Sequence, residues 1–328
     1  MSGLLPTDGP GEPPGPSGIR RWRLGRGETW ALVTALAYTA TNLFLRAAAV
    51  HIDPWLGSLL RQVPVFAFAW GAVAITRSGE VWPASPRFLG WRFALALVGG
   101  GTISFVFGNF LYFGALADGG LGITASGAQA GIILTALVAG LLVLGERPGR
   151  TVQAGAGVLV GGLVLIALAG GAATDAWLSG LAFALGAGAC YALSNVLTRM
   201  VQRTRPTVFA ALAGTSLGGL GPLLVIALLR GGGNPLAGAD PGQVGVVLVA
   251  GCFNALALFG IVQSLRHTTV AISSSIQSSA VVFSYIVAVT LFSESSAPLM
   301  VAGVVVVAAG IVVSQLGRAT PPADPVGS

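Results

Sequence analysis

Two stretches of this sequence carry the same three polar residues at the same four-residue spacing. The first set is Tyr38, Asn42 and Arg46, and the second, 153 residues later, is Tyr191, Asn195 and Arg199. Side chains four residues apart lie along one face of a helix, with a slow drift. Such a face can bind a small polar solute by hydrogen bonds. The alternative is that the amides hold one helix against another and that the two arginines reach the membrane surface.

Arg61 is a single charge in an otherwise apolar segment, about two turns after Pro54 and beside Gln62. Its equivalent in the second half of the chain is Ala213, so the charge has no counterpart there. A guanidinium is costly at membrane depth, and it binds carboxylates and phosphates well. We therefore expect Arg61 to meet an anionic group of a substrate. A structural arginine paired with a carbonyl or with Asp53 is the alternative.

Further amides and phenols occur in apolar segments, where each needs a polar partner or water. The residues expected to line a central cavity are Tyr38, Asn42, Arg61, Asn109, Tyr112, Gln129, Asn195, Asn254 and Gln277. In this interpretation the amides orient the solute, and Tyr38 and Tyr112 stack on it or gate it. The serine run from Ser273 to Ser279 is more typical of close helix packing.

Residues suited to enzymatic or metal chemistry are sparse. His51 and His267 stand at loop edges, and Cys190 and Cys252 lie inside apolar blocks. No HExxH motif, Cys/His cluster or phosphate-binding loop is present, so we expect no enzymatic activity, no cofactor and no metal site.

Acidic residues lie at the ends of apolar segments or between them. Glu146 and Glu294 each end a segment and are expected to pair with Arg147, Arg150 or a neighbouring loop. A proton-coupled exchanger built around a carboxylate in mid-membrane is therefore disfavoured.

The elements that carry these residues are membrane-spanning helices. The sequence is 54% hydrophobic and only 9% charged, with apolar blocks of roughly 20 residues, the length that crosses a bilayer. This composition excludes a soluble domain and makes the lipid bilayer a partner. The net charge of +6 comes from arginines that do not cluster with aromatic residues, so nucleic acid is not an expected partner.

Ten spans are predicted, separated by Pro, Gly and Asp. They are 29–50, 55–76, 90–113, 121–144, 151–170, 177–198, 207–229, 243–265, 270–292 and 298–316. A Pro- and Gly-rich tail at 1–28 and a short tail at 317–328 are expected to be disordered. If the amino end is inside, 14 of the 17 arginines fall on the cytoplasmic side, which places both termini in the cytoplasm of a bacterial cell.

An internal repeat divides the chain into two halves of five helices, 29–170 and 177–316. At an offset of 148, Gln129, Glu146, Gly155 and Gly162 match Gln277, Glu294, Gly303 and Gly310. Because five is odd, the second half must enter the membrane from the opposite side. The last helix of each half has almost no polar side chain, so it is expected outside the cavity, against lipid or against a second protomer in a homodimer.

Several of these segments resemble the EamA repeat of the drug/metabolite transporter superfamily. The resemblance rests on Phe113–Leu116, Leu144–Arg147, Gly155–Leu168, Ala37–Arg46, and Pro54 with Arg61. It is weaker in the second copy, where Phe292-Ser-Glu294 replaces Leu-Gly-Glu. The proline common in the fourth and ninth helices of the family is absent here. The resemblance implies an all-α carrier of two inverted EamA repeats around a basket-like cavity.

The function expected from the sequence is secondary transport. A small metabolite, such as an amino acid or another anionic or zwitterionic solute, would be exported across the cytoplasmic membrane by alternating access. The alternative is a scaffold or lipid-handling membrane protein in which the polar faces serve only helix assembly.

Overall fold

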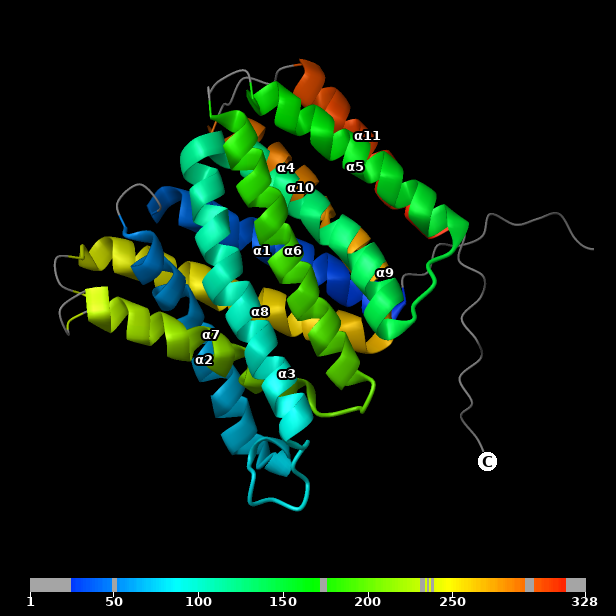
Figure 1. Cartoon of the computed structure of the whole chain (residues 1–328). Coiled ribbons are helices and arrows are strands. Elements are labelled where there is room, and N and C mark those ends of the chain that lie inside the picture. Colours follow the sequence, from blue (N-terminus) through cyan, green and yellow to red (C-terminus); the bar gives the residue numbers. More distant parts are fainter. Residues whose placement is uncertain are drawn as a thin grey trace, which may run out of the picture.

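The computed structural model describes residues 25–48, 52–171, 176–230, 234, 236, 239–292 and 298–316 (Figure 1). His51, Asp175, Glu294, Arg318 and nearly all of the two predicted tails lie outside these ranges. The described residues form helices and no strands. The helices are α1 (Arg26–Ala48), α2 (Pro54–Thr76), η1 (Gly79–Val81), α3 (Trp91–Thr102), the π-helix η2 (Ile103–Gly108), α4 (Asn109–Leu144), α5 (Arg150–Gly171), α6 (Trp177–Gln202), α7 (Val208–Arg230), α8 (Pro241–His267), α9 (Val270–Gln277), α10 (Ser279–Phe292) and α11 (Pro298–Leu316).

Seven stretches of the described residues are long and apolar enough to cross a membrane, and two shorter apolar stretches follow at Val270–Ile286 and Pro298–Ser314. The chain is therefore a multi-pass helical membrane protein. Helix α1 begins at Arg26, three residues before the predicted start of the first span. Arg26 and Glu28, which were expected in the tail, are therefore part of the first helical turn.

The third and fourth predicted spans both fall within the continuous stretch from α3 through η2 to α4, although a turn is predicted at Asp118. The backbone stays helical through residues 116–122. Even so, Leu111 and Gly131 both meet α6 at residues 185–186. Because 20 residues of straight helix would hold them about 30 Å apart, the chain must double back between them. The predicted reversal is present, but it is made by helical backbone.

The ninth predicted span is present as an apolar helical stretch that begins at Val270, interrupted only at Ser278 between α9 and α10 and without a proline there. Ser278 keeps a right-handed helical backbone (φ −61°, ψ −18°). The Ser274 carbonyl accepts the Ser278 hydroxyl at 2.9 Å and the Gln129 side-chain amide at 3.2 Å, as well as the Ser278 backbone N–H. Serine hydroxyls that bond back to the preceding turn bend helices. These bonds, rather than a proline, mark the junction between α9 and α10.

Helices α5 and α11 pack against each other at the edge of the bundle (Figure 1). The four repeat-related glycines lie in this contact: Gly155 meets Ser314, Gly310 meets Leu159, and Gly162 and Gly303 meet each other. Since residue numbers rise along one helix as they fall along the other, the two helices are antiparallel. A β-carbon on Gly162 would lie 2.6 Å from the Val307 backbone nitrogen, which only glycine avoids.

Other small-residue pairs differ in what they do. Gly214 and Gly218 face Leu97 and the Val98 backbone, so this pair packs α7 on α3. Gly157 and Gly161 face open space, because a β-carbon added to either would meet no heavy atom within 4 Å. The spacing alone therefore does not identify a helix contact.

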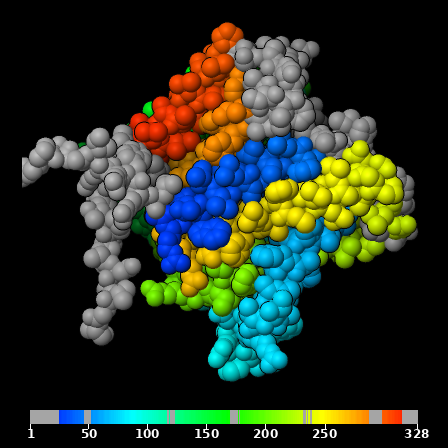
Figure 2. Space-filling view, turned by 180° about the vertical axis from the view of Figure 1, so that it is seen from behind, coloured from blue at the N-terminus to red at the C-terminus, as the bar shows by residue number. Residues whose placement is uncertain are grey.

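Helix α1 lies along α8, as the blue and yellow surfaces in Figure 2 show. Thr34 and Thr41 donate hydrogen bonds across this contact to the carbonyls of Ala257 (3.2 Å) and Ala250 (3.4 Å). These bonds hold the face of α1 that carries Tyr38 and Asn42 toward the centre of the bundle.

Candidate functional site

A cavity of about 150 Å³ lies between the helices, with walls from both halves of the chain. Eight of the nine residues expected from the sequence line it: Tyr38, Asn42, Arg61, Tyr112, Gln129, Asn195, Asn254 and Gln277. They come from α1, α2, α4, α6, α8 and α9. Tyr38 and its repeat equivalent Tyr191 both line this one cavity, as do Asn42 and Asn195. The side chain of Arg46, the third member of the first motif, lies outside the described residues.

Arg61 is the only charged residue among those that line the cavity in the described part of the chain. Its Nη2 donates to Asn109 Oδ1 at 2.8 Å, and its Nε is buried without a partner. The alternative pairing with Asp53 is not formed. Asp53 caps the start of α2 by accepting the Trp55 and Leu56 N–H groups, and it faces Arg230 at 3.5 Å. Among the described residues that line the cavity, no carboxylate neutralises this guanidinium.

Asn109 does not line the cavity, contrary to the prediction, but stands behind Arg61. Its Oδ1 accepts two hydrogen bonds, from Arg61 at 2.8 Å and from the Tyr191 hydroxyl at 2.9 Å. The side chain is 2% exposed because these two donors, from α2 and α6, hold it between the helices. Tyr112, three residues later in α4, does line the cavity.

Tyr191 is a cavity residue that was not among those expected, although its pairing with Tyr38 in the repeat pointed to it. Tyr38, Tyr112 and Tyr191 line the same cavity as Arg61, and the Tyr191 hydroxyl shares the acceptor Asn109 Oδ1 with it. The rings of Tyr112 and Tyr191 are 6.4 Å apart between centroids and tilted by 54°. Three phenols and one guanidinium therefore share the wall of this cavity.

Three of the five cavity amides differ in whether the protein supplies a hydrogen-bond partner. Gln129 and Gln277 are used by the protein, because Gln129 donates to Ser278 Oγ (2.8 Å) and Gln277 donates to Ser273 Oγ (2.8 Å). Asn254 is 1% exposed and its Nδ2 has no partner. A buried amide group without a partner is costly, so a solute or water atom is needed beside it.

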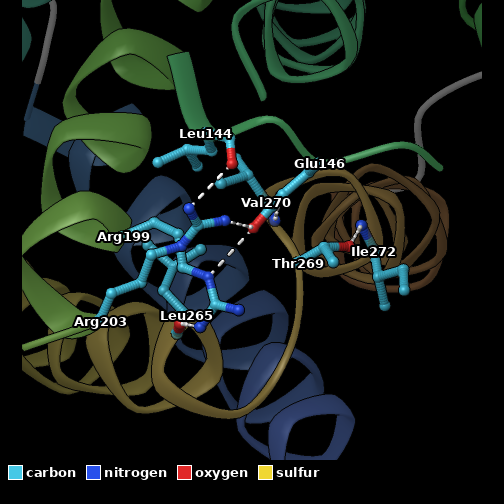
Figure 3. A network of polar contacts seen from close by, with 8 residues as sticks. All are labelled: Leu144, Glu146, Arg199, Arg203, Leu265, Thr269, Val270 and Ile272. Atoms are coloured by element: carbon cyan, nitrogen blue, oxygen red, sulfur yellow. Dashed lines mark hydrogen bonds and ion pairs between the residues drawn. The ribbon is translucent and has the colours of Figure 1, made fainter. Parts of the chain in front are cut away.

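Glu146 makes a polar network at one end of the cavity, with partners that differ from those expected (Figure 3). Its Oε1 accepts from Arg199 Nε at 3.2 Å and from Arg203 Nη2 at 3.3 Å, and its Oε2 accepts the Val270 N–H at 3.3 Å. Arg199 and Arg203 also bind the carbonyls of Leu265 and Leu144. The expected partners were Arg147, Arg150 or a neighbouring loop. The network joins the ends of α4, α6, α8 and α9.

The fold and cavity together define a helical membrane protein with a polar chamber inside its bundle, the general form of a solute carrier. Residues 178–315 match the model of the EamA-like transporter family and thereby form a domain of the drug/metabolite transporter superfamily. The resemblance is thus confirmed for residues 178–315, in the second half, where the likeness was expected to be weaker.

Similarity to solved structures supports the fold. One crystal structure, titled only as that of a protein, superposes with a TM-score of 0.71 at 18% identity, covering 89% of this chain and 97% of the other. No curated protein matches the chain. The family is that of membrane transporters of small solutes, and the solute follows from neither comparison.

Proposed function

We propose that this protein is a secondary transporter for a small solute that carries a carboxylate or phosphate group. In this proposal Arg61 binds the anionic group, and Asn42, Asn195 and Asn254 orient the rest of the solute by hydrogen bonds. The three phenols, Tyr38, Tyr112 and Tyr191, pack on its apolar part. The observation that carries the proposal is the unneutralised guanidinium of Arg61 in the wall of the cavity.

The physical reason is the cost of an unpaired charge in a partly buried site. Removing one partner of a buried ion pair destabilises a protein strongly, because the remaining charge has lost its compensation. Among the described cavity residues no carboxylate compensates Arg61, and in this proposal a solute anion supplies the missing charge. A scaffold, in which the polar faces serve only helix assembly, has no use for such a site.

The transport cycle in this proposal is alternating access by two inverted repeats of five helices each. Its support is the antiparallel packing of α5 and α11 and the repeat-related residues that line one cavity from both sides. We further propose that the protein resides in the bacterial cytoplasmic membrane, with both termini in the cytoplasm, and that it exports its solute.

The test uses purified protein in liposomes and a panel of labelled amino acids, dicarboxylates, sugar phosphates and neutral sugars. Arg61→Gln should reduce binding of the anionic solute roughly 10- to 100-fold, because hydrogen bonds to charged groups contribute about 1.5–3 kcal/mol each. Arg61→Lys keeps the charge and should lose less. Arg230→Gln, an exposed arginine that pairs with Asp53, is the matched control and should transport normally.

Two results would contradict the proposal. One is an unchanged rate in Arg61→Gln for every solute that the wild type transports. The other is transport of neutral sugars alone, since the guanidinium would then serve no bound anion.

A further inference from the structure

We infer that α9 is a hinged gate that closes one end of the cavity, latched by Glu146 and pivoting at Ser278. The inference deepens the proposed function, because a carrier needs a barrier that opens on one side at a time. It depends on the network around Glu146, on the helix break and on the packing between them.

The latch fixes the first residue of α9. Glu146 Oε2 accepts the Val270 N–H, which is an otherwise unpaired group at the start of a helix, while Arg199 and Arg203 hold the carboxylate from α6 (Figure 3). The two arginines also bind the carbonyls at the ends of α8 and α4. Each helix end in the network therefore meets a charge that complements its dipole. The Glu146 side chain is only 10% exposed, which limits screening by water.

The pivot is at the other end of α9. Here Gln129 of α4 donates to both the Ser274 carbonyl and the Ser278 hydroxyl, at the position where α9 stops and α10 begins. A helix interrupted at membrane depth is tolerated where its backbone groups are bound by neighbouring side chains. Gln277, the last residue of α9, lines the cavity, as do Ala280 and Val281 of α10.

Between latch and pivot, α9 is buried on nearly all sides, with only Ile272 of its eight residues partly exposed. It is rich in serine, and Ser273 bonds to Ser264 of α8 at 2.8 Å. Water can replace such hydroxyl contacts, so separation of this helix costs less than separation of an apolar one. Val270 itself belongs to an apolar cluster that closes this end of the bundle. The cluster comprises Ala136, Ala139, Leu144, Ala192, Val196, Ile261, Leu265 and Val270.

The experiment measures access to the cavity without any solute. Ser194, which lines the cavity and is 7% exposed, is replaced by cysteine in a background where Cys190→Ala and Cys252→Ala remove the native thiols. A membrane-impermeant thiosulfonate is applied to inside-out and right-side-out vesicles separately. Glu146→Gln should raise the labelling rate at least fivefold from the membrane face on which Glu146 lies.

Glu80→Gln is the matched control. Glu80 is also a carboxylate that binds a backbone N–H near a helix start, that of Thr207 at 2.8 Å, but it touches neither α9 nor the cavity lining. Its variant should label within twofold of the parent. Arg203→Gln removes one latch arginine and should give an intermediate rate, which keeps the test informative if Glu146→Gln does not fold.

A cross-link provides the converse test. Ala136 of α4 and Ala271 of α9 line the same small crevice beside Glu146. A short bifunctional thiol reagent that joins cysteines at these two positions should abolish transport and return the labelling of Glu146→Gln to the parent rate.

The inference is overturned if Glu146→Gln labels at the parent rate, or if the cross-linked protein transports at full speed. Because labelling needs no solute, it separates the gate from the proposed function. Faster labelling in a protein that transports no anion would leave the gate standing and remove the anion carrier. If Arg61→Gln impairs transport of the anion but Glu146→Gln labels at the parent rate, the anion carrier stands and the gate is removed.

Discussion

Asn109→Asp should convert the cavity from one that binds anions into one that excludes them. Asn109 Oδ1 lies 2.8 Å from Arg61 Nη2, so the substitution places a carboxylate in contact with the guanidinium with almost no change in shape. Two unit charges about 4 Å apart attract by about 4 kcal/mol at an effective dielectric constant near 20. A solute anion would have to displace this attraction.

We expect the affinity for the anionic solute to fall at least roughly 100-fold, since each 1.4 kcal/mol is a factor of ten in binding. The assay is equilibrium binding of the solute that proves active in liposomes, together with the thermal midpoint of the protein without solute. That midpoint should rise, because the lone charge is now compensated. The companion substitution Tyr191→Phe removes only one neutral donor to Asn109 and should cost about 1 kcal/mol or less.

A double-mutant cycle identifies the cause. If Asn109→Asp acts by neutralising Arg61, it should have little further effect on anion binding when added to Arg61→Gln. The reasoning is refuted if Asn109→Asp binds the anion as tightly as the wild type, or if it reduces binding of neutral and anionic solutes equally.

Two further predictions concern packing and orientation. Gly162→Leu should lower the free energy of unfolding by about 1–3 kcal/mol, the usual cost of overpacking, because its side chain would meet the Val307 backbone; the loss is measured as a lower thermal midpoint. Gly161→Leu, one position away in open space, should leave the midpoint unchanged. Equal effects of the two substitutions would show that α5 and α11 are not in contact. Cysteines at the exposed positions Arg150 and Arg230 should be labelled from opposite faces of intact cells, with Arg150→Cys on the cytoplasmic side, and labelling from one face would show that the predicted topology is wrong.

Much of the cavity could be predicted because the bilayer makes polar groups conspicuous. An amide or guanidinium in a run of apolar residues needs an internal partner, so Asn42, Arg61 and Asn254 could be assigned to an interior surface by residue type alone. The repeat added Asn195 and Gln277. It also pointed to Tyr191, whose equivalence to Tyr38 carries the same information.

The differences have local physical causes that the pattern does not contain. Asn109 is held behind Arg61 by donors from α2 and α6, a contact that the sequence pattern does not contain. The break at Ser278 has neither Pro nor Gly and depends on Gln129, which is 149 residues away in sequence. Glu146 binds Arg199 and Arg203, more than 50 residues away, rather than its sequence neighbours. Each of these features requires knowledge of which helices are adjacent.

The glycine contact between α5 and α11 also bears on how the molecule assembles. The glycines of each helix leave a groove that the other helix fills, so either half produced alone would expose that groove without its partner. The glycine contact thus contributes to holding the two halves together in the folded protein.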